Sequence, residues 1–195
     1  MGRPKTISDD AILRIARDIF SRHGHTATTR QVANAAGISE AILYQRFGTK
    51  DALFFASLHP RGPDIEELLG PDDPPDDAHE YLCTVVRRLG AYFAEVIPLA
   101  LREMMHPSFE PASLSRTTPG GGAELRDGLA RRIASLARRK QLAAPDEVVV
   151  ARVLLSLAHD WALGISFAHG KVAARDRKLE EFVAVLWVGI RPHDA

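Results

Sequence analysis

The residues of this 195-residue chain that could carry out acid–base or metal chemistry are few. Glu103 and His106 have the Glu-x-x-His spacing, which places both side chains on one helical face, as in di-iron bundles. No second such pair with two further helical Glu residues accompanies them, and the pair lies next to Pro107 at a predicted helix end. His159 and Asp160 are adjacent in sequence, so they do not share a helical face. No glycine-rich phosphate loop and no Cys or His metal-ligand spacing occurs. We therefore expect no enzyme activity, no bound metal and no cofactor.

A different chemistry, hydrogen bonding to double-stranded DNA, is indicated by residues 28–53. Thr28 and Gln31 have the T-x-x-Q spacing of a capping box, which predicts a helix that begins directly after Thr28. Gly37 can adopt the left-handed conformation that ends this helix, and Ser39 can cap a second one. Two short helices joined by a tight glycine turn form a helix-turn-helix unit, whose second helix lies in a major groove.

Side chains on the second helix and around both helix starts are the candidate DNA contacts. Gln45 can pair bidentately with adenine, the apolar members of the set can meet thymine methyl groups, and Tyr44 can donate its hydroxyl to a phosphate. Glu40 is unusual there, because an anion near a phosphate is repulsive unless it accepts from a cytosine amine. Leu43 and Phe47 should face the core. For each candidate the alternative is a solvated surface residue. The predicted DNA-binding residues are Arg3, Lys5, Thr28, Thr29, Arg30, Ser39, Glu40, Ala41, Ile42, Tyr44, Gln45, Thr49 and Lys50.

Composition and charge are typical of a packed, soluble protein, with 46% hydrophobic and 26% charged residues. The net charge is zero, so attraction to nucleic acid needs a local excess of positive charge. Residues 1–60 hold eight Lys or Arg against five Asp or Glu, whereas residues 64–80 hold eight acidic residues and no Lys or Arg. The single cysteine, Cys83, allows no internal disulfide, and no apolar run approaches the ~18 residues that span a bilayer. We therefore expect a cytoplasmic protein.

Helical periodicity continues on both sides of residues 28–53. A helix over 9–23 should pack under the DNA contacts, and a further helix should follow the Thr49 cap until Pro60 and its neighbours interrupt it. A short helical turn in "DIEELL", a long helix from about residue 78 and helices around 125–136, 148–168 and 179–190 come next. Pro98 should kink or restart the long helix. A basic cluster after Leu129 is expected to be a solvated face; its members are Arg131, Arg132, Arg138, Arg139 and Lys140.

The central helices could enclose a small-molecule site. Aromatic and aliphatic side chains would form its wall, with Glu103 and His159 as additional polar groups. A well-filled core with surface charges is the alternative. The predicted ligand-binding residues are Leu89, Phe93, Arg102, Met104, Met105, His106, Phe109, Leu129, Ile133, Leu157 and Trp161.

The last two helices carry apolar stripes that are wider than packing within one chain needs, which indicates burial against a partner. The alternative is that both helices belong to the core of a monomer. The predicted dimer residues are Leu155, Trp161, Ile165, Phe182, Val183, Leu186, Trp187 and Ile190.

The segments "TTRQVANAAGIS", "AILYQRF" and "TKDAL" resemble the DNA-binding signature of the TetR family of transcriptional repressors, over roughly Ile7–Leu58. Lys50 and Tyr44 match contacts of that family. The resemblance implies an all-α homodimer, with a three-helix helix-turn-helix DNA-binding domain in residues 1–58 and a helical ligand-binding and dimerisation domain in 59–195. It implies a one-component repressor that binds palindromic operator DNA and responds to a small-molecule effector. The alternative is a helical ligand-binding or scaffolding protein without sequence-specific DNA binding.

Overall fold

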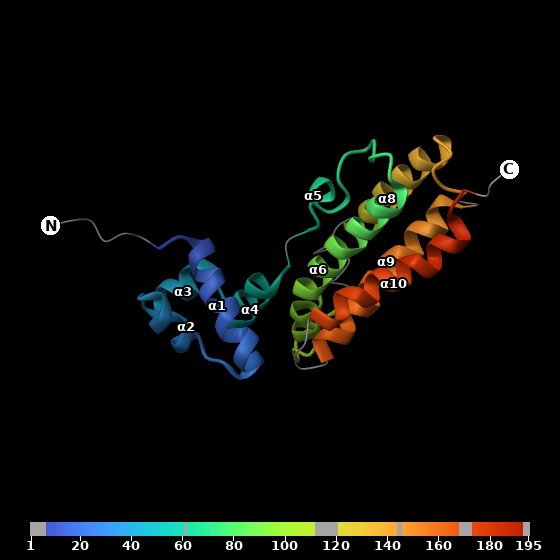
Figure 1. Ribbon diagram of the computed structural model, residues 1–195. Coiled ribbons are helices and arrows are strands. Elements are labelled where there is room, and N and C mark those ends of the chain that lie inside the picture. Colours follow the sequence, from blue (N-terminus) through green and yellow to red (C-terminus); the bar gives the residue numbers. More distant parts are fainter. Residues whose placement is uncertain (1–6, 61, 112–120, 144–145, 168–172, 193–195) are drawn as a thin grey trace. The chain divides into compact units, whose positions relative to one another are not determined.

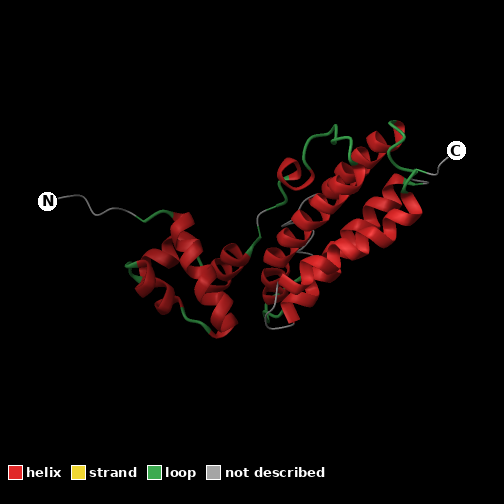
Figure 2. Cartoon of the chain, in the orientation of Figure 1, coloured by secondary structure: helices red, strands yellow, loops and turns green. Residues whose placement is uncertain are grey.

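The computed structural model describes residues 7–60, 62–111, 121–143, 146–167 and 173–192, and every regular element within them is a helix (Figures 1 and 2). The predicted all-α fold class is therefore confirmed. Contacts divide the chain into two units. The first unit combines Met1–Arg61 with Pro98–Thr117, and the second combines Gly62–Ile97 with Thr118–Ala195.

The first unit contains α1 (Asp9–His23), the 3-10 turn η1 (Gly24–Thr26), α2 (Thr29–Ala36), α3 (Glu40–Phe47) and α4 (Lys50–Leu58). Ser8, Thr28, Ser39 and Thr49 cap the four α-helices, each accepting a backbone N–H with its hydroxyl. These caps satisfy donors that a helix start otherwise leaves without a partner. The core beneath the helices is fully buried, and in it the rings of Phe20 and Phe54 meet edge to face with centroids 5.0 Å apart.

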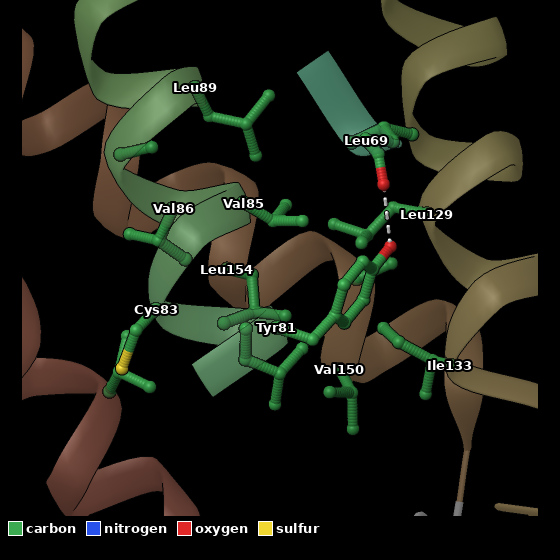
Figure 3. Close-up of a cluster of buried hydrophobic side chains, with 14 of the residues drawn as sticks. Leu69, Tyr81, Cys83, Val85, Val86, Leu89, Leu129, Ile133, Val150 and Leu154 are labelled. Atoms are coloured by element: carbon green, nitrogen blue, oxygen red, sulfur yellow. Dashed lines mark hydrogen bonds between the residues drawn. The ribbon is translucent and has the colours of Figure 1, made fainter. Parts of the chain in front are cut away.

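The second unit contains α5 (Ile65–Leu69), most of α6 (Ala78–Met104), α8 (Gly121–Arg138), α9 (Glu147–Phe167) and α10 (Ala173–Ile190). Its core gathers side chains from α5, α6, α8 and α9, and the Tyr81 hydroxyl within it donates to the Leu69 carbonyl over 3.0 Å (Figure 3). Gly90 allows α6 to approach α9 and α10 closely, because a Cβ there would lie 3.1 Å from the Trp161 ring and from Leu179. The periodic leucines of residues 125–136 are buried, as their spacing predicted.

Pro98 was expected to kink or restart the long helix; it lies inside α6, which continues through it, so the helix does not restart there. The helix continues to Met104 and ends before Pro107, as expected. Pro98 is nevertheless the residue at which the contacts pass from the second unit to the first. One helix therefore belongs to both units, and its last two turns pack with the N-terminal helices.

The basic cluster on α8 is not a uniformly solvated face. Arg132 is only 3% exposed and donates to the carbonyls of Gly70, Pro71 and Gly128, with Asp72 3.0 Å away. Arg139 is partly buried and lies 3.1 Å from Asp76. The prediction was wrong for these two residues because the acidic "GPDDPPDD" loop folds over α8. Its carbonyls and carboxylates bind the guanidinium groups and so offset the free-energy cost of removing them from water.

Helix α9 also departs from the sequence expectation about apolar runs. Its mean hydropathy over 18 residues is 1.6, so by length and composition it qualifies as a candidate membrane span. Arg152 and Asp160 interrupt the sequence but do not lower the average enough to exclude it. Five of its residues are buried in the second unit, including Leu154 and Ala158. Core helices of soluble proteins pass the same compositional test.

Candidate nucleic-acid interface and ligand cavity

Helix α3 presents one exposed face to solvent. Ala41, Tyr44 and Gln45 are all exposed, and their i, i+3, i+4 spacing places them side by side. Leu43 points the opposite way and is 1% exposed, while Phe47 is half-buried against the same core. Burial of a leucine side chain contributes about 1.5–3 kcal/mol, which fixes the rotation of α3 about its axis. The residues predicted to read bases therefore lie on the face that remains free.

The turn between α2 and α3 has the predicted geometry. Gly37 is left-handed, with φ 67° and ψ 30°, and Ile38 donates its N–H to the Ala33 carbonyl over 3.0 Å. Both halves of the capping box form: the Thr28 N–H donates to Gln31 Oε1 over 2.8 Å, and the Gln31 N–H donates to Thr28 Oγ1 over 3.3 Å. The two helices are thus held at a defined angle by backbone geometry.

Thr29 joins the two helices through its side chain. It is 6% exposed, its hydroxyl donates to Glu40 Oε2 over 2.7 Å, and it lies 3.2 Å from the Tyr44 hydroxyl. Thr29 was predicted as a phosphate contact, but the structure turns its hydroxyl inward. The same contact accounts for the unusual Glu40, whose carboxylate accepts from a neighbouring helix.

The remaining predicted contacts surround α3. Thr28 and Arg30 are exposed, and the Lys50 ammonium donates to the His25 carbonyl over 2.6 Å, which holds it at the start of α4. Arg46 is occupied elsewhere, since it donates to the Ile7 carbonyl and pairs with Asp9. Two more predicted DNA contacts belong to α3 and its cap: Ile42 is half-buried and Ser39 is exposed. Thr49, which caps α4, is also exposed. The predicted contacts Arg3 and Lys5 lie outside the described residues.

The second unit contains an open cavity of about 520 Å³ between α6, α8 and α9. Its lining residues are Pro63, Tyr92, Phe93, Val96, Gly122, Leu125, Leu155, Ser156 and His159. Of the predicted ligand-binding residues only Phe93 lines it, together with His159, which was expected as an additional polar group. Helical periodicity marks the apolar face of α6 but does not show which part of that face is covered, so the sequence could not locate the cavity.

The other predicted ligand residues lie elsewhere. Three are fully buried core of the second unit: Leu89, Leu129 and Ile133. Leu157 and Trp161 are half-buried on α9. The rest belong to the first unit: Arg102, Met104, Met105, His106 and Phe109.

The N-terminal helices match a known protein family. Residues 12–57 match the family described as bacterial regulatory proteins, tetR family. Over 67 residues the chain is 36% identical to the HTH-type transcriptional repressor Rv3405c of Mycobacterium tuberculosis, a match that covers 34% of this chain and 36% of that protein. The chain thus spans about a third of the length of the curated relatives that it matches. Residues 12–57 of this chain therefore belong to the TetR family.

Solved structures of TetR-family proteins share the fold over most of the chain. A TetR transcriptional regulator from Agrobacterium tumefaciens has a TM-score of 0.70 at 18% identity, covering 93% of each chain. The flavonoid-responsive regulator FrrA has a TM-score of 0.57 at 22% identity, covering 95% of this chain and 97% of that one. At these identities the likeness shows a shared fold, that of solved TetR-family structures.

In this chain the end of α6 is tied to the DNA-binding helices. Arg102 donates to the Ser21 carbonyl over 2.7 Å, and buried His106 Nε2 lies 3.6 Å from Asp51 Oδ1. The Ser108 N–H donates to His106 Nδ1, so a neutral ring carries its proton on Nε2, facing Asp51. Burial lowers the pKa of His106 below its usual value, and the Asp51 carboxylate opposes part of this shift. Glu103 and His106, the Glu-x-x-His pair of the sequence, are both buried in the first unit. Among the described residues no group of three His, Cys, Asp or Glu is placed to hold a metal ion.

The last two helices of the chain leave apolar side chains uncovered. On α10, Phe182, Val185 and Val188 are 45%, 76% and 63% exposed, and on α9 Val149 and Val153 are exposed as well. Two predicted dimer residues are buried within their own chain instead: Val183 at 1% and Ile190 at 5%. They were misassigned because a wide apolar stripe has an inner and an outer part that periodicity alone does not separate. The other five predicted dimer positions, apart from exposed Phe182, are half-buried: Leu155, Trp161, Ile165, Leu186 and Trp187.

Proposed function

We propose that this protein is a cytoplasmic repressor that binds palindromic operator DNA as a homodimer and releases or holds it in response to a small-molecule effector. One observation carries the DNA-binding part: α3 has a single exposed face, formed by Ala41, Tyr44 and Gln45, between two capped helix starts. Such a face can enter a major groove while backbone N–H groups at the helix starts meet phosphates. The relative Rv3405c, named a repressor, supports the direction of regulation.

The uncovered apolar face of α9 and α10 supports the homodimer. Phe182, Val185 and Val188 recur every three residues on one side of α10, and no described part of the chain covers them. Contiguous apolar surface of this kind marks an interaction site in soluble proteins. A two-fold interface between identical faces would bury it and would present two α3 helices to two half-sites of one operator.

The cavity between α6, α8 and α9 supports the effector response. Its volume of about 520 Å³ falls in the range of small-molecule pockets, roughly 300–1,000 Å³. FrrA, a protein of the same fold, is named for its response to flavonoids. We assign the effector of this protein to the cavity and leave Leu89, Leu129 and Ile133 to the core that supports it.

Selection from a pool of random duplexes tests the DNA-binding part. We expect the wild-type protein to enrich one palindromic sequence. Gln45→Ala should cost about 1–3 kcal/mol at one base position in each half-site and relax the preference there. Arg22→Ala, on the exposed Asp18–Arg22 pair of α1, is the control and should leave the selected sequence unchanged. If no sequence is enriched, the scaffolding or ligand-binding alternative holds instead.

A further inference from the structure

The walls of the cavity in the second unit carry no permanent charge. The lining residues are aliphatic, aromatic or polar, and none of them is Asp, Glu, Lys or Arg. An ionised group placed there would give up part of its hydration without gaining a counter-ion, which is unfavourable. The cavity therefore disfavours carboxylates, phosphates and ammonium groups.

Aromatic rings form one wall. The rings of Tyr92 and Phe93 on α6 have centroids 5.4 Å apart, and the His159 ring meets Phe93 edge to face at 5.6 Å. Leu125 on α8 and Leu155 on α9 supply aliphatic surface to the same cavity. Flat aromatic ligands gain from such edge and face contacts beyond the burial of apolar area.

The polar groups of the cavity are concentrated on α9. Ser156 and His159 are three residues apart, which places both on one helical face, and both are exposed. Within the described part of the chain, no hydrogen bond engages the Ser156 hydroxyl or a ring nitrogen of His159. Together they offer donors and acceptors at one place in an otherwise apolar site.

We infer that the cavity binds a neutral, mainly aromatic molecule with one hydrogen-bonding group, such as a phenolic hydroxyl or a ketone, directed at Ser156 and His159. The inference rests on the proposed effector function, whose site it specifies. The apolar body of the ligand would contact Tyr92, Phe93 and Leu155.

Calorimetric titration of the full chain at neutral pH with three matched probes tests this. We expect 2-naphthol to bind, naphthalene to bind about 3- to 10-fold more weakly for want of its hydrogen bond, and the 2-naphthoate anion to bind far more weakly than either. In His159→Phe, which keeps a ring against Phe93, the preference for 2-naphthol over naphthalene should shrink, and in the double variant Ser156→Ala/His159→Phe it should vanish. Ser156→Phe should fill the cavity and weaken both neutral probes, whereas exposed Asp160→Asn is the control and should change nothing.

Binding of 2-naphthoate as tight as that of 2-naphthol, or no binding of either neutral probe, would overturn the inference. A preference for 2-naphthol over naphthalene that survives in Ser156→Ala/His159→Phe would overturn the assignment of the polar contact. Circular dichroism of each variant shows whether the helices are intact, and the naphthalene titration then separates a lost polar contact from a lost cavity. The proposed function is measured separately by duplex selection, so a correct ligand class with no selected operator, or the reverse, identifies which proposal fails.

Discussion

Replacement of Thr29 by valine tests the contact that joins α2 to α3. Valine has the shape of threonine and the same β-branching, so the substitution removes the hydroxyl while keeping the packing of this 6% exposed side chain. Two contacts are lost: the 2.7 Å hydrogen bond to the Glu40 carboxylate and the 3.2 Å contact with the Tyr44 hydroxyl. Hydrogen bonds to charged groups contribute about 1.5–3 kcal/mol, and half-buried Glu40 can regain water, so we expect a loss of about 1–2 kcal/mol.

Amide hydrogen exchange in α2 and α3 is the suitable assay. Both tryptophans, Trp161 and Trp187, lie in the second unit, so tryptophan fluorescence would report on the wrong part of the chain. A loss of about 1–2 kcal/mol should speed exchange in the helix-turn-helix by roughly 5- to 30-fold and leave α8 and α9 unchanged. Thr26→Val is the matched control, because its hydroxyl donates to a carbonyl in an exposed position where water can replace it.

A double-mutant cycle with Glu40→Gln isolates the contact itself. If the hydroxyl and the carboxylate interact as described, the losses of Thr29→Val and Glu40→Gln will not add in the double variant. Full additivity, within about 0.3–0.5 kcal/mol, would refute the claim that Glu40 is held by Thr29. Glu40 would then have to be explained as a base contact to cytosine.

Three further outcomes follow from the same contacts. Lys50→Ala should weaken DNA binding for all sequences and reduce the slope of log affinity against log salt concentration by about 0.9 per phosphate contact removed. Tyr44→Phe should weaken binding and leave that slope nearly unchanged. If Lys50→Ala also leaves the slope unchanged, as the Arg22→Ala control should, this lysine donates only to the His25 carbonyl. Phe182→Asp should shift sedimentation toward monomers, and a wild-type monomer at micromolar concentration would contradict the dimer. Burial raises the pKa of Glu103. The stability that this group contributes is therefore present at low pH and is lost as the pH rises through the raised pKa. Glu103→Gln should raise the thermal unfolding midpoint at pH 8 and change it little at pH 4.

The helix-turn-helix could be predicted almost residue by residue because its signals are local. The capping box at Thr28, the left-handed Gly37 and the Ser39 cap each depend on neighbours within a few residues, and all three occur in the structure. Spacing also predicted that Leu43 is buried while Tyr44 and Gln45 are exposed. The local pattern did not predict that the Thr29 side chain points inward, because its partner Glu40 lies eleven residues away on the next helix.

Sequence patterns failed to predict burial where the residues that cover a side chain are remote in sequence. Arg132 looks solvated from its neighbours on α8, yet the carbonyls that bury it belong to a loop about sixty residues earlier. The cavity was misplaced for the same reason: Leu125 and Leu129 have the same character in the same helical stripe, but α6 and α9 leave space beside one and cover the other. Val183 and Val185 differ likewise, since only packing against the rest of the second unit makes one core and the other surface.

The boundary between the two units lies at Pro98, inside α6, so one helix carries contacts of both units. A helix interior proline removes a backbone donor, so α6 is held across this position by fewer hydrogen bonds than elsewhere. Before Pro98, α6 supplies Tyr92, Phe93 and Val96 to the cavity; after it, Arg102 and His106 contact Ser21 and the start of α4, beside Lys50. If the proposed effector binds the cavity, a shift of the first half of α6 would act on a helix whose second half contacts the N-terminal helices. The short, Pro-interrupted connection after α4 need not transmit the change, because the continuous helix offers a second covalent path.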